Sequence, residues 1–155
     1  MYHDGLRNGK LAHFEPLQHI QSTDPGCKSR GELRILEFGA GPGKTRFAKI
    51  HFLQKLLNKY CIIYTSGANF ELLPPNTRLT VVEPNRFFQP VFEENLKKYP
   101  AVKLDHYIIG KAEDMSAISD GSIDVVISTC VLCSVDNTEE TLKEIQRVLV
   151  PVLNK

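Results

Sequence analysis

The chain has 155 residues, of which 19 are Lys or Arg and 18 are Asp or Glu, so its formal net charge is +1. This length suits one domain, and 42% hydrophobic residues are enough to build a core. The balanced charge gives no electrostatic reason to expect a nucleic-acid partner. No run approaches the roughly 18 apolar residues of a membrane span, and the first residues contain no apolar signal sequence. We therefore expect a globular cytoplasmic protein.

Four cysteines are too few for a disulfide scaffold, so we expect reduced thiols. Cys130 and Cys133 form a C-x-x-C pair, but no second pair completes a tetrahedral zinc site, and no metal is expected. Two interpretations of this pair stay open. It is either a redox dithiol or two small apolar residues at the end of a buried strand, and we favour the second.

The first third of the chain contains one clear strand. Residues 1–32 are polar and broken by Pro and Gly, and we expect a short helix at about 10–20 followed by a loop. Leu33–Phe38 is short, apolar and flanked by glycines, as a buried strand is. From residue 44 apolar side chains recur at helical spacing, in a stretch with five Lys or Arg and no acid; Cys61–Tyr64 then extends this helix or forms a strand.

The rest of the chain alternates strands and helices. We expect strands at 78–83, 102–109 and 123–129. The apolar residues of the last one are continuous rather than alternating, as in a strand buried on both faces. A helix is expected at 87–99, with Pro90 in its first turn and with Phe88, Val91, Phe92 and Leu96 facing inward. A last helix at 139–150 is expected to be capped by Asn137 or Thr138.

This alternation predicts an open, parallel α/β sheet with helices on both faces and Leu33–Phe38 at its centre. Ligands of such sheets bind at the carboxyl ends of the strands. The loops after Phe38, Glu83, Ile109 and Thr129 should therefore meet at one edge.

The glycine-rich segment after Phe38 supports two functional hypotheses. In the first it is a phosphate-binding loop, because Gly43, Lys44 and Thr45 match the end of G-x-x-x-x-G-K-[ST]. The opening glycine of that pattern would fall on Phe38, whose side chain crowds the turn. The acid for the magnesium ion would have to be Asp124.

In the second hypothesis the segment is a nucleotide-type loop of the form E-x-G-x-G-x-G, which begins at Glu37. Glycines permit the tight turn and let a ligand approach the backbone closely. Glu83 ends the next strand, where a carboxylate accepts the hydroxyl protons of a ribose. Glu113 and Asp114, after the third strand, are placed to meet an adenine amino group.

Four segments carry a family resemblance: Ile35–Gly41, Val81–Asn85, Gly110–Met115 and Asp120–Val135. They resemble class I S-adenosylmethionine-dependent methyltransferases, and more closely the alkyl thiol S-methyltransferase family of animals. The resemblance implies a Rossmann-like fold, S-adenosyl-L-methionine as cofactor and methyl transfer to a small acceptor, with a thiol favoured. It identifies no catalytic residue.

The resemblance also implies a set of cofactor-binding residues. The glutamate and glycines of the first loop would line the methionine end, Glu83 would hold the ribose, and the two acids after the third strand would face the adenine. Cys130 and Val131 would border the methyl-transfer site. The full set is Glu37, Gly39, Ala40, Gly41, Gly43, Glu83, Pro84, Asn85, Glu113, Asp114, Cys130 and Val131.

The chain departs from the family pattern at residues 44–67, which interrupt the loop; joining Gly43 to Ala68 restores E-F-G-A-G-P-G-A-N-F. We interpret this basic insertion as a retained intron and expect it to disable the cofactor site. Members of the resembled family have an N-terminal membrane anchor that places them at the endoplasmic reticulum or lipid droplets, and we expect no counterpart of it in this sequence.

We expect an N-terminal segment at 1–32 and a partial methyltransferase domain at 33–155. Because the family continues with further strands after the position of Pro151, one edge of the sheet is expected to be unpaired. The competing functional hypotheses are an impaired methyltransferase, an inactive truncated pseudoenzyme and a phosphate-loop nucleotide-binding protein.

Overall fold

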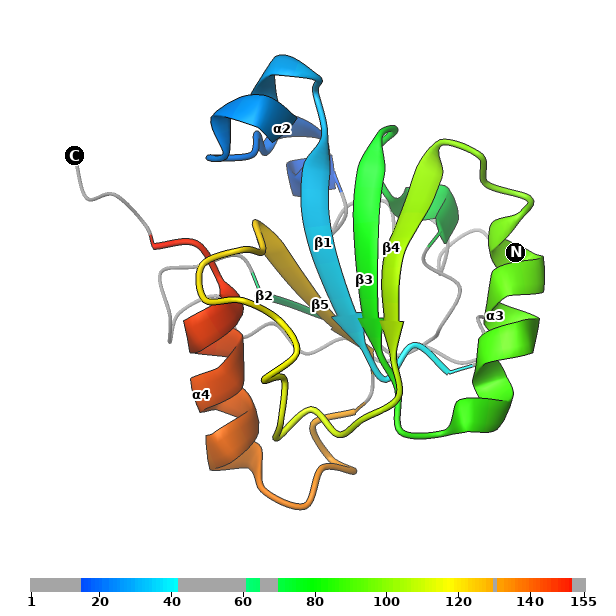
Figure 1. The fold of residues 1–155 in the computed structure, drawn as a ribbon, viewed down its shortest axis with the longest axis vertical. Coiled ribbons are helices and arrows are strands. Elements are labelled where there is room, and N and C mark those ends of the chain that lie inside the picture. Colours follow the sequence, from blue (N-terminus) through cyan, green and yellow to red (C-terminus); the bar gives the residue numbers. More distant parts are fainter. Residues whose placement is uncertain (1–14, 42–60, 65–69, 130, 152–155) are drawn as a thin grey trace, which may run out of the picture.

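A computed structural model describes residues 15–41, 61–64, 70–129 and 131–151, and its described part is built around one parallel sheet (Figure 1). The strand order is β2-β5-β1-β3-β4, so β1 is central as expected. The strands are β1 Leu33–Phe38, β2 Cys61–Tyr64, β3 Thr77–Val82, β4 Val102–Ile108 and β5 Val125–Thr129. The expected α/β class is confirmed.

The register of the sheet brings the ends of β1 and β3 together. Leu33 pairs with Thr77 at the start of the two strands, and Phe38 pairs with Val82 at their end. On its other side β1 pairs with β5, from Ile35 opposite Val125 onward. The expectation that the loops after these strands meet at one edge is therefore confirmed.

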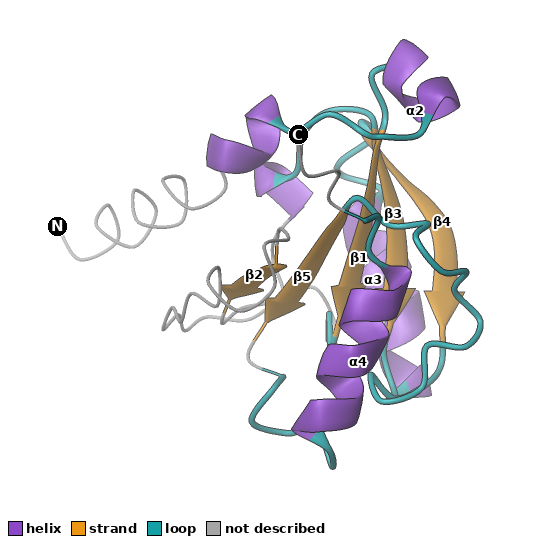
Figure 2. Ribbon diagram, turned by 90° about the vertical axis from the view of Figure 1, so that its left-hand side faces the viewer, coloured by secondary structure: helices purple, strands orange, loops and turns teal. Residues whose placement is uncertain are grey.

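Two helices cover opposite faces of the sheet, as Figures 1 and 2 show: α3 (Gln89–Leu96) and α4 (Thr138–Val148). On the α3 face, Phe92 packs edge-on against Phe70, with ring centroids 4.9 Å apart. On the α4 face, Ile145 and Val148 pack with apolar side chains of β1 and β5. Burial on both faces explains why β1 and β3 each have five of their six residues buried.

Both helices begin close to where the sequence predicted. A 3-10 turn, η3 (Arg86–Phe88), leads into α3, which carries Pro90 in its first turn and ends at Leu96. Val91 is 44% exposed, so its expected inward orientation is wrong. Asn137 caps α4, because its side-chain oxygen accepts hydrogen bonds from the backbone N–H of Glu139 and Glu140.

The N-terminal part is less helical than expected. A single 3-10 turn, η1 (Glu15–His19), stands where the described residues overlap the expected helix at 10–20, and residues 1–14 lie outside the description. The short helix α2 (Pro25–Ser29) follows, capped by Asp24, and the 3-10 turn η2 (Phe70–Leu72) precedes β3. No helix of the described residues is long and apolar enough to cross a membrane.

The 44–67 segment contributes a strand to the sheet. Of the two interpretations of Cys61–Tyr64, the strand is confirmed: it is β2, which pairs in parallel with β5 (Figure 2). β2 therefore covers the outer side of β5 and is itself the terminal strand of the described sheet on that side. The helix expected between residue 44 and β2 lies outside the described residues.

Candidate functional site

The candidate site begins with a turn at the carboxyl end of β1 in which two glycines have positive φ. Gly39 (φ 68°) donates its N–H to the carbonyl of Val82, at 2.8 Å, and so ties the turn to β3. A Cβ on Gly39 would lie 2.0 Å from Cγ2 of Val131. Gly39 is thus required both by backbone conformation and by close packing.

Gly41 (φ 58°) is required for its backbone conformation alone, since none of the described residues lies within 4 Å of a Cβ placed on it. The described residues therefore leave this side of the turn open. Ala40, between the two glycines, is buried in the core on the α3 face. Gly43 lies outside the described residues.

Glu83, directly after β3, ties its own loop to the glycine turn. It is 5% exposed, and its Oε2 accepts the N–H of Gly41 at 2.9 Å. Its Oε1 accepts the N–H of Asn85, also at 2.9 Å. A carboxylate oxygen has two lone pairs, so each oxygen can accept one further hydrogen bond.

A second buried carboxylate, that of Glu37, lies at the end of β1 and is 2% exposed. It pairs across β1 and β3 with Val81, which in turn pairs with Tyr107 on β4. Burial, followed by the charges of Glu83 and two other glutamates, raises the pKa of Tyr107 to about 12. Glu37 and Glu83 thus place two buried carboxylates at this edge of the sheet.

The hydroxyl of Tyr107 has no hydrogen-bond partner within the described part of the chain, although it is buried. The Tyr107 ring packs edge-on against Phe92, with centroids 5.3 Å apart. Sequence analysis missed this residue, because an alternating strand pattern carries no information about whether one hydroxyl finds a partner.

Pro84 and Asn85 form the loop after Glu83. Pro84 is exposed, and the side chain of Asn85 accepts the N–H of Phe87 at 3.1 Å, which starts η3. The loop therefore folds back beside the Glu83 carboxylate, whose Oε1 holds the Asn85 amide.

The two acids after β4 bind backbone groups. One oxygen of Glu113 accepts the N–H groups of Asp136 and Asn137, at 2.6 and 3.1 Å, at the start of α4. The carboxylate of Asp114 accepts the N–H of Ser116. Hydrogen bonds from the side chain of Ser116 and then from its backbone lower the pKa of Asp114. Both acids thus stabilise loops in the described structure, and neither contacts Glu83 there.

Sequence analysis also missed what holds the loop after β4 against α4. Lys111 and Asp136 form an ion pair with a 2.5 Å N–O distance. Farther along α4, Glu144 accepts the N–H of Met115 at 2.7 Å, and Arg147 donates to the Met115 carbonyl at 2.8 Å. The spacing of Glu144 and Arg147 on one helix face could have been read from the sequence. Their common partner Met115, in the loop after β4, could not.

Of the two residues expected at the methyl-transfer position, Val131 is described and Cys130 is not. Val131 lies just after β5, is partly buried with the core on the α4 face, and contacts Gly39 closely. The ends of β1 and β5 are therefore joined at this contact. No group of three or more His, Cys, Asp or Glu that could bind a metal ion occurs among the residues the structure describes.

The position of Asp124 contradicts the phosphate-loop hypothesis. Asp124 immediately precedes β5 and pairs with Arg34 near the start of β1, at 2.8 and 3.0 Å between side-chain atoms. It is therefore at the amino end of the sheet, whereas the glycine turn follows the carboxyl end of β1. Burial raises the pKa of Asp124, but hydrogen bonds from Arg34 outweigh this effect and the pKa is lowered.

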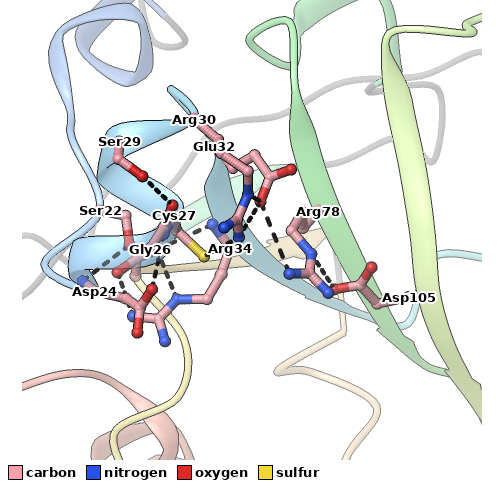
Figure 3. Close-up of polar contacts among 11 residues, drawn as sticks. Ser22, Asp24, Gly26, Cys27, Ser29, Arg30, Glu32, Arg34, Arg78 and Asp105 are labelled. Carbon is pink, nitrogen blue, oxygen red and sulfur yellow. Dashed lines mark hydrogen bonds and ion pairs between the residues drawn. The ribbon is translucent and has the colours of Figure 1, made fainter.

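Asp124 belongs to a polar network at the amino end of the sheet, part of which Figure 3 shows. There Glu32 lies between two arginines, 2.9 Å from Arg30 and 3.7 Å from Arg78. Arg78 also pairs with Asp105 on β4, at 2.9 Å. Arginines neutralise these carboxylates, so we infer that the carboxylates stabilise the fold rather than bind a ligand.

The sheet order, the glycine turn and the acid after β3 define a doubly wound α/β fold, a class whose ligands bind at the carboxyl edge of the sheet. A family model described as a methyltransferase domain matches residues 64–152, which is more than half of the chain. The chain therefore belongs to the methyltransferase domain family.

Curated relatives are similar to this chain. It is 38% identical over 151 residues to the thiol S-methyltransferase TMT1A of Homo sapiens, which covers 97% of this chain and 50% of that protein. It is 37% identical over 86 residues to the human thiol S-methyltransferase TMT1B, covering 56% of this chain and 35% of that protein. The chain thus spans half or less of the length of these relatives.

Solved structures share the fold. A putative S-adenosyl-L-methionine-dependent methyltransferase from Methanococcus maripaludis has a TM-score of 0.57 at 11% identity, covering 91% of this chain and 50% of that one. The YcgJ protein of Bacillus subtilis has a TM-score of 0.58 at 16% identity, covering 92% of this chain and 47% of that one. These similarities confirm the Rossmann-like fold expected from the sequence.

Proposed function

We propose that this chain forms the cofactor-binding part of an S-adenosyl-L-methionine-dependent methyltransferase. The observation that carries the proposal is the 2.9 Å hydrogen bond from the Gly41 amide to Glu83 Oε2. It sets a buried carboxylate with spare acceptor capacity beside a glycine turn that is open on one side.

The described residues fit this cofactor. Within the described part of the chain each oxygen of Glu83 accepts one hydrogen bond, so a further acceptor position on each suits the two hydroxyls of a ribose. The side of Gly41 that the described residues leave open lets a ligand approach the backbone. The cofactor supplies a reactive methyl group on a positively charged sulfur.

We further propose a small thiol as the methyl acceptor. Support comes from the names of the similar human proteins, which are thiol S-methyltransferases. A thiolate is the reactive form of a thiol, and positioning it in line with the methyl group supplies most of the acceleration. Val131, held against Gly39, forms part of the wall at the end of β5 where such an acceptor would approach.

Calorimetric titration of the 155-residue chain with S-adenosylhomocysteine tests cofactor binding. Incubation with the methyl donor and a small alkyl thiol, followed by mass spectrometry, then tests methyl transfer. Binding together with S-methyl product supports the full proposal, and binding without product limits it to the cofactor. No heat of binding either in the folded chain or in a folded variant in which Gly43 is joined to Ala68 would refute it.

The effect of the insertion needs its own comparison. The sequence predicts that residues 44–67 disable the cofactor site, and only β2 of this segment is described. A variant in which Gly43 is joined to Ala68 should bind S-adenosylhomocysteine more tightly than the full chain. Equal affinity of the two folded proteins would show that the insertion is tolerated.

A further inference from the structure

The segment 131–137 between β5 and α4, which we call the β5–α4 turn, begins beside the glycine turn. The N–H groups of Ser134 and Val135 both donate to the carbonyl of Val131, at 2.7 and 3.1 Å. The side chain of Val131 packs against Gly39. Val131, Leu132 and Val135 are half-buried with the core on the α4 face. The β5–α4 turn therefore keeps some apolar surface accessible near the candidate site.

Glu113 holds the other end of the β5–α4 turn. Its Oε1 accepts the N–H of Asp136 at 2.6 Å and the N–H of Asn137 at 3.1 Å. Asn137 is also the residue that caps α4. Because Glu113 lies in the loop after β4, one carboxylate oxygen joins that loop to the end of the turn and to the start of the helix (Figure 1).

The Glu113 bonds are the stronger of two links between the loop after β4 and the turn. The other link is the ion pair of Lys111 with Asp136, whose side chains are 65% and 73% exposed. Water and salt screen an ion pair that is so exposed, so it contributes little. The hydrogen bonds to Glu113 are assisted by the charge of its carboxylate and have fixed backbone donors. The position of the turn therefore depends mainly on Glu113.

We propose that Glu113 is a positioning residue for the methyl acceptor, which acts by holding the β5–α4 turn in the shape against which a small apolar thiol packs. The inference rests on the proposed function, from which it takes the cofactor and the acceptor. Glu113 contacts neither of them. Misplacement of a reacting group by about 1 Å can cost a factor of 100 in rate. Two hydrogen bonds that fix the turn can thus govern methyl transfer while the cofactor is bound as before.

Three variants test the proposal, each made in the 155-residue chain and in the chain with Gly43 joined to Ala68. Glu113→Ala removes the link. Glu113→Gln is the conservative control, because an amide oxygen can accept the same two N–H groups. Glu144→Ala is the control for a loss of stability, since it removes a hydrogen bond between α4 and the loop after β4, at Met115, outside the β5–α4 turn.

The first measurement is hydrogen exchange at single amides, followed by NMR. In Glu113→Ala the amides of Ser134 and Val135 should exchange about tenfold faster or more, because the turn opens more often. The amide of Val126, inside β5, should keep its rate and so report that the sheet is intact. Unchanged rates at Ser134 and Val135 would overturn the proposal, because Glu113 would then not hold the turn.

The second measurement compares kcat/KM for a small alkyl thiol with the affinity for S-adenosylhomocysteine. Glu113→Ala should lower kcat/KM about tenfold or more and change the dissociation constant less than about threefold. Glu113→Gln and Glu144→Ala should stay close to the unsubstituted chain in both.

The outcomes separate this inference from the proposed function. An unchanged kcat/KM in Glu113→Ala, an equal loss in Glu144→Ala, or no recovery in Glu113→Gln would overturn the inference and leave the proposed function standing. No methyl transfer by either unsubstituted chain would instead refute the thiol acceptor, and this inference with it.

Discussion

The backbone N–H of Gly41 donates to Oε2 of Glu83 at 2.9 Å, across 42 residues of sequence. This bond joins the turn after β1 to the loop after β3, two neighbouring strands of the sheet. Because Glu83 is 5% exposed, its carboxylate is held in one place before any ligand arrives. Such preorganisation lowers the entropic cost of binding.

The two glycines of the turn should respond differently to substitution. Gly39→Ala combines a positive φ with a Cβ only 2.0 Å from Val131, so we expect a loss of about 2–4 kcal/mol in the free energy of unfolding. Gly41→Ala meets none of the described residues within 4 Å and should cost about 1 kcal/mol. Urea unfolding followed by circular dichroism measures both.

The double variant Gly39→Ala/Val131→Ala is the control for the steric part. Removing the Val131 methyl groups should recover part of the loss caused by Gly39→Ala, because the new Cβ then has room. Strictly additive losses in the double variant would show that the contact with Val131 is not the cause.

Removing the hydroxyl of Tyr107 should not destabilise the protein. A buried donor without a partner costs free energy, so Tyr107→Phe should leave the free energy of unfolding unchanged or raise it by about 1 kcal/mol. Absorbance titration should also lose the tyrosine that ionises at about 12. A loss of stability above about 1 kcal/mol would mean that the hydroxyl has a partner.

The Arg34–Asp124 pair should govern acid stability. The Asp124 side chain is 2% exposed, and Asp124→Asn leaves Arg34 without its partner, which should cost about 3–5 kcal/mol at pH 7. Asp105→Asn, whose side chain is 24% exposed, is the milder control.

The sign of the pH effect follows from the pKa of Asp124, which is lowered from 3.8 in the folded chain. The stabilisation is therefore complete well above 3.8 and is lost as the pH falls through the folded pKa. Unfolding measured from pH 7 to pH 3 should show a steeper loss for the unsubstituted chain than for Asp124→Asn. Parallel curves would contradict this assignment.

Glu113 should affect stability more than cofactor affinity. One of its oxygens accepts two N–H groups at the start of α4, so Glu113→Ala should lower the free energy of unfolding by about 1–3 kcal/mol. Its affinity for S-adenosylhomocysteine, measured on the folded variant, should change less than that of Glu83→Ala. A larger change in affinity for Glu113→Ala than for Glu83→Ala would support the contact between Glu113 and the adenine that the sequence predicted.

The sequence predicted the central sheet because β1, β3 and β5 are short, mostly apolar segments in a chain that alternates strands with helices. Strands covered by helices on both faces have this pattern. It also placed Gly41 and Glu83 at one edge. The sequence left the structure of β2 ambiguous, because a run of four apolar residues fits a helix or a strand. Only the tertiary structure, in which this run pairs with β5, decides between the two.

Two further features of the site depend on tertiary geometry rather than on local pattern. Glu113 and Asp114 were expected beside an adenine, but the loop after β4 turns their carboxylates to backbone N–H groups. The close contact of Gly39 with Val131 joins two segments 92 positions apart, and no spacing within either segment indicates it.

The most direct test of the account is calorimetric titration of S-adenosylhomocysteine into the chain and into Glu83→Ala, with Glu94→Ala on the exposed face of α3 as control. A buried carboxylate that accepts two ribose hydroxyls contributes about 1.5–3 kcal/mol, so Glu83→Ala should weaken binding about tenfold to a hundredfold and Glu94→Ala should not. Equal affinity of the three folded proteins would contradict the assignment of Glu83 to the cofactor site.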